Sequence, residues 1–231
     1  MTVIYLDYNA TTPLDGTVVE AMMPYLTKHH GNPSSGHERG AIVKEAVIKA
    51  RQQVATLLGA SSEEVVFTSS GSESNNQVLK GVAHTRRADG DHIITSTIEH
   101  PAILMPCAFL EQNGFRITRV PVDGTGMVDP DDVRKAITPR TILISIMHAN
   151  NEVGTIQPIA EMAKIARQAG VWFHTDAAQT TGKIRTKVDE LGVDFLTVAG
   201  HKLYAPQGIG ALYIRSGIEI EPLIHGAGHE G

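Results

Sequence analysis

The segment Ala199-Gly200-His201-Lys202-Leu203-Tyr204-Ala205-Pro206 places a lysine between two apolar runs, at 194–198 and 211–215, that the sequence predicts as strands. A lysine at the mouth of two such strands is partly removed from water, which lowers the pKa of its amine and makes it a candidate nucleophile toward a carbonyl group. A lone lysine is far more often a solvated surface residue. A second polar residue changes this balance, because Asp176 follows another apolar run at 171–175.

Together, Lys202 and Asp176 favour a site for pyridoxal 5′-phosphate. The aldehyde of this cofactor condenses with a lysine amine, and its ring nitrogen needs a carboxylate nearby to stay protonated as an electron sink. Side chains that follow parallel strands meet at one edge of the sheet, where ligands bind. The sequence therefore predicts a cofactor site built around Lys202.

Apolar runs alternate with helical patterns along most of the chain, which predicts an α/β fold with a mainly parallel sheet covered by helices on both faces. Gly59 is placed to cap one of the helices. Residues 1–15 are expected to form an extended arm, and residues 16–231 one large domain. We expect strands near 65–68, 92–96, 115–122, 141–147, 171–175, 194–198 and 211–215, and helices near 15–29, 37–58, 71–87, 102–112, 131–136 and 160–169.

Seven short motifs in a fixed order carry a resemblance to a known family. The motifs are Tyr5-Leu6-Asp7-Tyr8-Asn9-Ala10-Thr11-Thr12-Pro13, Gly31-Asn32-Pro33-Ser34-Ser35, Ser72-Glu73-Ser74-Asn75-Asn76, Glu99-His100, Asn150-Asn151-Glu152-Val153-Gly154, Asp176-Ala177-Ala178-Gln179 and Gly200-His201-Lys202. On these motifs the chain resembles the cysteine desulfurases of the NifS/IscS-like group and the related selenocysteine lyases, within the class V aminotransferases of fold type I. The resemblance implies that the chain forms the large domain that binds pyridoxal 5′-phosphate in these enzymes.

The phosphate group of the cofactor is expected at the start of a helix. Gly71 and Ser72 open the predicted helix and offer backbone amides, a hydroxyl and the positive end of the helix dipole. The alternative is a plain helix cap. The resemblance gives Gly71, Ser72 and His201 the role of phosphate contacts. It also predicts weaker or differently supplied phosphate binding, because Ala199 stands where the family often has serine.

The resemblance assigns the remaining site residues around the cofactor ring. Asp176 pairs with the ring nitrogen, Gln179 bonds the ring hydroxyl, and His100 stacks on the ring and helps to move protons. Asn151 contacts the cofactor and holds the substrate carboxylate, and Lys202 carries the cofactor and moves protons. Two of these residues have simpler alternatives, since His100 could be a structural histidine and Asn151 could serve a turn.

The implied reaction removes sulfur from L-cysteine, leaves L-alanine, and passes the sulfur through an enzyme persulfide to a sulfur-acceptor or scaffold protein for iron–sulfur or other cofactor assembly. Such a nucleophile must be a reactive, accessible thiolate. Cys107 lies in an apolar helical segment at 102–110, which favours an inert buried thiol. The resemblance places the catalytic cysteine, a substrate-binding arginine and the small C-terminal domain beyond residue 231, so they are expected to be missing here.

Two alternatives remain open from the sequence. The chain could be a selenocysteine lyase, which acts on selenocysteine. It could also be a non-catalytic module that binds pyridoxal 5′-phosphate or a partner and needs another chain for activity. Addition of L-cysteine separates enzyme from module, because a module alone releases neither sulfide nor alanine.

Composition excludes several classes of partner and of site. The 231 residues are 42% hydrophobic and carry a net charge of −5, so there is no broad basic surface for nucleic acid or an anionic membrane. One cysteine excludes an internal disulfide framework, and the 11 histidines form no recognisable metal motif, so no metal site is expected. No signal peptide or membrane span is apparent. We expect a cytoplasmic protein, and the resemblance implies a homodimer.

Overall fold

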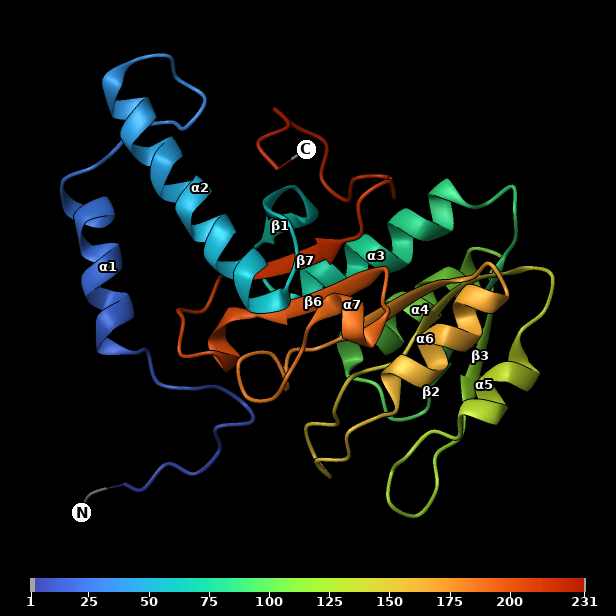
Figure 1. The fold of residues 1–231 in the computed structure, drawn as a ribbon. Coiled ribbons are helices and arrows are strands. Elements are labelled where there is room, and N and C mark those ends of the chain that lie inside the picture. Colours follow the sequence, from blue (N-terminus) through green and yellow to red (C-terminus); the bar gives the residue numbers. More distant parts are fainter. Residues whose placement is uncertain (1–2, 231) are drawn as a thin grey trace.

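Seven strands form a single sheet in the computed structural model, which describes residues 3–230 (Figure 1). Their order across the sheet is β1-β7-β6-β5-β4-β2-β3. β7 runs antiparallel to both of its neighbours, and the other adjacent pairs are parallel. The predicted α/β fold with a mainly parallel sheet is confirmed. The strands are β1 (Val65–Thr68), β2 (His92–Ser96), β3 (Arg116–Val120), β4 (Thr141–Ser145), β5 (Trp172–Asp176), β6 (Phe195–Ala199) and β7 (Gly210–Ile214).

Helices cover both faces of this sheet. In Figure 1, α5, α6 and α7 lie on one face, while α3 and α4 lie on the other. Two further helices stand to one side: α2 lies beside β1, and α1 lies farther out, on the side of α2 that faces away from the sheet. The helices are α1 (Gly16–Thr27), α2 (Glu38–Leu58), α3 (Gly71–Thr85), α4 (Pro101–Gln112), α5 (Pro130–Ala136), α6 (Ile159–Gln168) and α7 (Val188–Leu191), with short 3₁₀ turns η1 (Ser62–Glu64) and η2 (Gly200–Lys202).

The sequence placed most elements correctly and misjudged some of their ends. The helix predicted near 15–29 ends at Thr27, and the strand predicted near 141–147 ends at Ser145. α7 was not predicted, because a helix of four residues is too short to show a periodic pattern. Gly59 caps α2 with a left-handed φ of 72°, as the sequence predicted.

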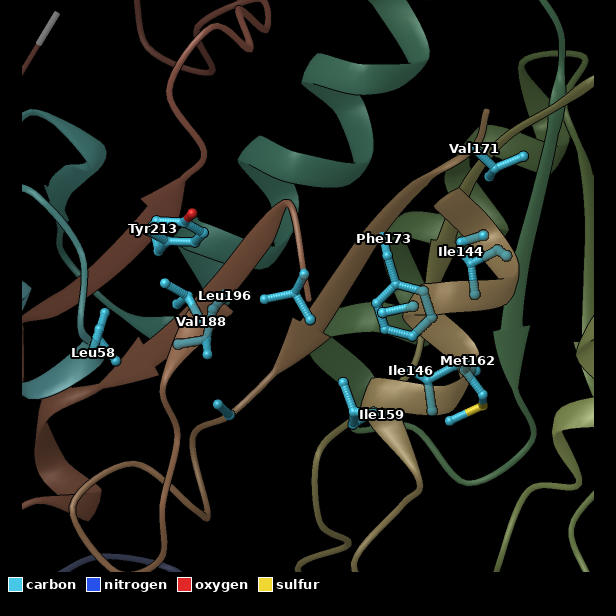
Figure 2. Close-up of a cluster of buried hydrophobic side chains, with 14 of the residues drawn as sticks. Leu58, Ile144, Ile146, Ile159, Met162, Val171, Phe173, Val188, Leu196 and Tyr213 are labelled. Atoms are coloured by element: carbon cyan, nitrogen blue, oxygen red, sulfur yellow. The ribbon is translucent and has the colours of Figure 1, made fainter. Parts of the chain in front are cut away.

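Both faces of the sheet are apolar, and two separate hydrophobic clusters form the core. Neighbouring residues of one strand point into different clusters, as Phe195 and Leu196 do in β6. The first cluster, in Figure 2, packs Phe173 and Ile144 of the sheet against Met162 of α6. Full burial of each such side chain stabilises the fold by about 1.5–3 kcal/mol. This two-sided burial explains why the strands read as continuous apolar runs.

The N-terminal arm lies along the sheet edge that carries the predicted site residues. Residues 3–15 contain no regular helix or strand. Thr12 ties the arm to the lysine segment, since both its backbone N–H and its hydroxyl donate to the carbonyl of His201, at 2.9 and 3.0 Å. The ends of the predicted arm and domain at residues 1–2 and 231 lie outside the described residues. No helix within residues 3–230 has both the length and the apolar character needed to cross a membrane.

Candidate active site

The predicted site residues follow five strands that all end at the same edge of the sheet. β2, β4, β5 and β6 run parallel, and β1 has the same direction because it lies antiparallel to β7. A segment with polar residues begins within three residues of the end of each strand. The segments are Ser69–Ser72 after β1, Glu99–His100 after β2, Met147–Asn151 after β4, Ala177–Gln179 after β5 and Gly200–Lys202 after β6.

These segments enclose a cavity of about 660 Å³, within the range of small-molecule sites. The cavity brings together every residue that the sequence assigned to the site. Its lining includes Gly71, Ser72, His100, Asn151, Asp176, Gln179, His201 and Lys202. Residues separated by more than 130 positions in the chain therefore share one pocket, while the role of each remains a prediction.

Lys202 occupies a half-buried position in η2, directly after β6. Its amine donates a hydrogen bond to the backbone carbonyl of Asn9 in the arm. Burial lowers the pKa of Lys202, and the positive charge of Lys183 lowers it further. The predicted direction of the pKa shift is confirmed, and a lowered pKa increases the share of neutral, nucleophilic amine.

The turn that carries Lys202 is held in place on both sides. Gly200 has no room for a side chain, because a Cβ there would lie 2.6 Å from Ile209 Cγ2. Tyr204 adopts a left-handed φ of 59°, which is uncommon for a residue with a side chain. Its backbone N–H donates to the hydroxyl of Thr12 at 2.8 Å. The arm and Ile209, which precedes β7, thus fix the direction from which Lys202 enters the cavity.

Asp176 is the last residue of β5, and each of its carboxylate oxygens accepts one hydrogen bond. Asn75 Nδ2 donates to Oδ2 at 2.7 Å, and the backbone N–H of Ala178 donates to Oδ1 at 3.0 Å. The residue is 7% exposed. A buried carboxylate with fixed orientation at the cavity wall is suited to meet a protonated ring nitrogen.

His100 combines the two uses that the sequence left open. It is the N-cap of α4, and its Nδ1 accepts a hydrogen bond from the backbone N–H of Ala102 at 3.1 Å. In a neutral ring the proton therefore sits on Nε2. The ring also lines the cavity. His100 can therefore serve both as the cap of α4 and as a cavity residue, because the cap hydrogen bond uses only the Nδ1 atom of its ring.

Glu99 precedes His100 in the same motif, has no role assigned from the sequence, and is deeply buried. Its carboxyl group accepts from the Ser96 hydroxyl at 2.6 Å and from the backbone N–H of Met147 at 3.0 Å. Burial raises the pKa of Glu99 to about 8. Glu99 thereby joins the loops that follow β2 and β4, on which His100 and Asn151 stand.

The N-terminus of α3 forms another wall of the cavity. Ser70 caps this 15-residue helix by accepting from the backbone N–H of Glu73 at 3.1 Å, and the first turn exposes further backbone amides. Gly71 packs tightly on β6, because a Cβ there would lie 3.2 Å from the Cβ of Ala199. Burial lowers the pKa of His201, and nearby Lys202 and His100 lower it further. An anion is favoured at such a helix start.

In the loop after β4, two neighbouring asparagines have different positions: Asn150 stabilises the turn, and Asn151 lines the cavity. Asn150 Oδ1 accepts from the backbone N–H groups of Glu152 and Val153, at 2.8 and 3.0 Å. Asn151 instead lines the cavity, and its Nδ2 donates to Glu152 Oε1 at 2.7 Å. The turn role that the sequence offered for Asn151 belongs to Asn150.

Sequence reasoning missed five polar residues that line the cavity: Asp7, Asn9, Ser70, Asn75 and Glu152. All except Ser70 lie inside the motifs that carry the resemblance, so their position in those motifs was the available signal. Asn9 contributes a backbone carbonyl, which accepts from Gln179 Nε2 at 2.9 Å as well as from Lys202. Every residue type has a backbone carbonyl, so the identity of Asn9 in the sequence gives no signal of this contact.

Cys107 lies away from this chemistry. It is 0% exposed in the cluster between α3, α4 and the sheet, and burial raises the pKa of its thiol to about 12. The expectation of a buried, inert cysteine agrees with this position. Among residues 3–230, no three His, Cys, Asp or Glu side chains gather to hold a metal ion.

Known proteins are similar to this chain in sequence, and a solved structure is similar to it in fold. The chain is 57% identical over 227 residues to cysteine desulfurase IscS of Dictyoglomus turgidum and 52% identical to that of Methanosarcina thermophila, in each case over 98% of its own length. It spans 58% and 56% of those two proteins. The solved structure titled "SspA in complex with cysteine" matches with a TM-score of 0.96 and 43% identity, over 99% of this chain and 66% of that one.

The aminotransferase class-V family model matches residues 4–229. This range includes every strand of the sheet and every residue of the cavity named above. The resemblance read from the motifs is confirmed. The chain belongs to the aminotransferase class-V family.

Proposed function

We propose that the chain binds pyridoxal 5′-phosphate through Lys202 and carries out the cofactor-dependent part of cysteine desulfuration. One observation carries this proposal: the amine of Lys202, the carboxylate of Asp176 and the N-terminus of α3 open into the same cavity. The names of the relatives support cysteine as the substrate. The chain spans little more than half of their length, so the activity of the whole protein is part of the proposal.

The donor set fits this cofactor. Lys202 supplies an amine with a lowered pKa for the aldehyde, and Asp176 supplies an oriented carboxylate for the ring nitrogen. Gly71, Ser72 and His201 would hold the phosphate at the start of α3. The acceptor and donor groups are therefore of the kinds that the two ends of the cofactor require.

Three other residues would orient the ring and the substrate. Gln179 would bond the ring hydroxyl, His100 would lie against the ring face, and Asn151 would hold the substrate carboxylate. When bound, the cofactor supplies an electron sink for the negative charge that develops on the substrate α-carbon. The amine of Lys202, once free, is placed to take and return a proton at that carbon.

The sulfur step requires a thiolate that these residues do not offer. The thiolate attacks the substrate sulfur, so that an S–S bond forms while the C–S bond breaks. The electron pair of the broken bond stays on carbon, which takes up a proton and becomes the methyl group of alanine. Cys107 is excluded as this thiolate by its burial and its raised pKa. The thiol must come from outside these 231 residues.

We propose a cytoplasmic homodimer that passes sulfur to an acceptor or scaffold protein for iron–sulfur or other cofactor assembly. The single cysteine supports a reducing compartment. Exposed apolar side chains support a protein partner, because α1 has no buried residue and Ile4, Leu6 and Leu26 are 80%, 86% and 71% exposed. Sedimentation of the wild type and of Leu6→Ser with Leu26→Ser tests whether this surface forms the dimer.

Alanine release tests the enzymatic proposal. The chain is incubated with pyridoxal 5′-phosphate and L-cysteine, with and without dithiothreitol as an external thiol, and alanine and sulfide are quantified. We expect alanine only with the external thiol, and none with Lys202→Ala. Binding of the cofactor without alanine under either condition would contradict the enzymatic proposal and support the non-catalytic module. A parallel incubation with L-selenocysteine separates the selenocysteine lyase, which would release alanine from that substrate alone.

A further inference from the structure

Asn75 and Asp176 form a buried pair that links the first helix of the site to the end of β5. Asn75 Nδ2 donates to Asp176 Oδ2 at 2.7 Å across 101 positions of the chain. Asn75 lies in α3, one turn after the residues expected to hold the phosphate, and is 1% exposed. Both residues line the cavity. The wall that faces the phosphate and the wall that faces the ring are thus joined by one hydrogen bond.

The chemistry of the pair fixes the orientation of the Asn75 amide. A carboxylate only accepts hydrogen bonds, so the NH₂ group must face Asp176 and the carbonyl oxygen must point elsewhere. Asn75 Oδ1 is buried and receives no hydrogen bond from residues 3–230. A buried acceptor without a donor destabilises a fold. An apolar residue of the same size would avoid that penalty, so the donation to Asp176 is the evident use of an amide here.

The effect of the pair falls on the carboxylate of Asp176. The backbone N–H of Ala178 holds Oδ1, and Asn75 holds Oδ2. One donor on each oxygen stops rotation of the carboxylate plane, and donation from an N–H group stabilises its negative charge. The Ala178 contact is local in sequence, whereas Asn75 reaches Asp176 from a different element. Asn75 is therefore the contact that sets the carboxylate relative to α3.

We propose that Asn75 is a positioning residue, which orients the Asp176 carboxylate so that it holds the ring nitrogen of pyridoxal 5′-phosphate in the protonated form. This inference rests on the proposed function, because it concerns the residue that meets the ring. In this inference Asn75 acts through Asp176.

The protonation state of the ring nitrogen tests the inference directly. The full chain is loaded with pyridoxal 5′-phosphate that carries ¹⁵N in the ring, and the ¹⁵N chemical shift is followed against pH for the wild type, Asn75→Leu and Asn75→Ala. Leucine matches asparagine in shape without its hydrogen bonds, and alanine adds no bulk. Asn113→Ala is the matched control, because Asn113 is exposed and its amide donates only to the carbonyl of Phe109, at 2.7 Å.

We expect the ring nitrogen of the wild type and of Asn113→Ala to remain protonated near pH 8. In both Asn75 variants the ring should lose its proton at a lower pH, and the dissociation constant of the cofactor should rise about tenfold, the effect of one charge-assisted hydrogen bond. The melting temperature of the cofactor-free chain should fall only modestly, because the substitution removes the unpaired Oδ1 of Asn75 but leaves Asp176 Oδ2 without this donor.

Three results would overturn the inference, and they are distinguishable. A wild-type ¹⁵N titration in both Asn75 variants would show that Asn75 does not act on the ring. A large fall in the melting temperature with an unchanged ¹⁵N shift would assign Asn75 a structural role only. Failure of the wild type itself to take up the labelled cofactor would overturn the proposed function, and the inference with it.

Discussion

The amine of Lys202 donates a hydrogen bond to the backbone carbonyl of Asn9, 193 positions earlier in the chain. The same carbonyl accepts from Gln179 Nε2 at 2.9 Å. The N-terminal arm therefore brings together the residue expected to carry the cofactor and the residue expected to bond its ring hydroxyl. The hydrogen bond to Asn9 orients the amine, but only the neutral form of the amine has a lone pair. Covalent attachment of the cofactor therefore requires Lys202 to lose its proton.

Lys183 is predicted to make that proton easier to lose. Its Nζ lies 3.3 Å from Gln179 Oε1, and its positive charge lowers the pKa of Lys202, second to the effect of burial. Lys183→Met removes the charge, so the pKa of Lys202 rises and less neutral amine is present near pH 7. We expect the rate of covalent cofactor attachment, measured by absorbance, to shift its pH dependence toward higher pH. Lys183→Arg keeps the charge and should retain the wild-type profile, whereas identical profiles for all three proteins would refute the electrostatic effect.

Glu99 is predicted to make the stability of the chain depend on pH. Burial raises its pKa to about 8 from 4.5. Between these values the folded chain keeps the proton while the unfolded chain has lost it, so the free energy of unfolding falls as the pH rises, by up to about 1.4 kcal/mol per pH unit. The fall begins above the unfolded pKa and levels off above pH 8.

Urea unfolding between pH 5 and 9 checks this prediction. Glu99→Gln has no proton to lose, so its unfolding free energy should change less with pH over this window than that of the wild type. Glu63→Gln is the control, because Glu63 is exposed. Equal pH slopes for the wild type and Glu99→Gln would show that the Glu99 carboxyl is already ionised in the fold, held by its Ser96 and Met147 donors.

Ala199→Ser is predicted to strengthen cofactor binding. The side chain of Ala199 lies against Gly71 at the start of α3 and lines the cavity, so a hydroxyl there would stand beside the expected phosphate position. A hydrogen bond to a charged group contributes about 1.5–3 kcal/mol, and we expect the dissociation constant of pyridoxal 5′-phosphate to fall about tenfold. Ala169→Ser adds a hydroxyl at an exposed position and serves as the control. An unchanged or weakened affinity for Ala199→Ser would place the phosphate elsewhere.

Cys107 is predicted to be chemically silent in the folded chain. Its thiol is fully buried, and burial raises its pKa to about 12. A thiol-specific reagent such as 5,5′-dithiobis(2-nitrobenzoate) should label it only after denaturation. Cys107→Ala should support the same thiol-dependent alanine release as the wild type. Rapid labelling of the native protein, or loss of turnover in a well-folded Cys107→Ala, would reopen a catalytic role.

Much of this fold was readable from the sequence because strands buried on both faces leave continuous apolar runs. The run before Asp176 and the run before Lys202 are both strands, and their ends meet at one edge as expected. The short helix α7 and the ends of some elements, such as the strand predicted near 141–147, escaped prediction. They are set by contacts with distant residues, as when Lys187 at the start of α7 donates to the carbonyl of Thr56, at 2.8 Å.

The sequence predicted many of the residues that line the cavity, but it did not predict the contacts among them. Motifs named the residues that line the cavity, because those residue types have specific chemistry. The pairing of Asn75 with Asp176 and the use of the Asn9 carbonyl depend on which segments the fold brings side by side. Such contacts arise from tertiary structure, and a single sequence holds no local signal for them.

The most direct test of the account is the covalent attachment of the cofactor to Lys202. The purified chain is mixed with pyridoxal 5′-phosphate, its absorption spectrum is recorded, and the sample is reduced with borohydride and mapped by peptide mass spectrometry beside Lys202→Ala. We predict a visible absorption band that the variant lacks, and a reduced adduct on Lys202 alone. No visible band in the wild type, or an adduct on Lys183 in place of Lys202, would contradict the central claim that this cavity is a cofactor site built around Lys202.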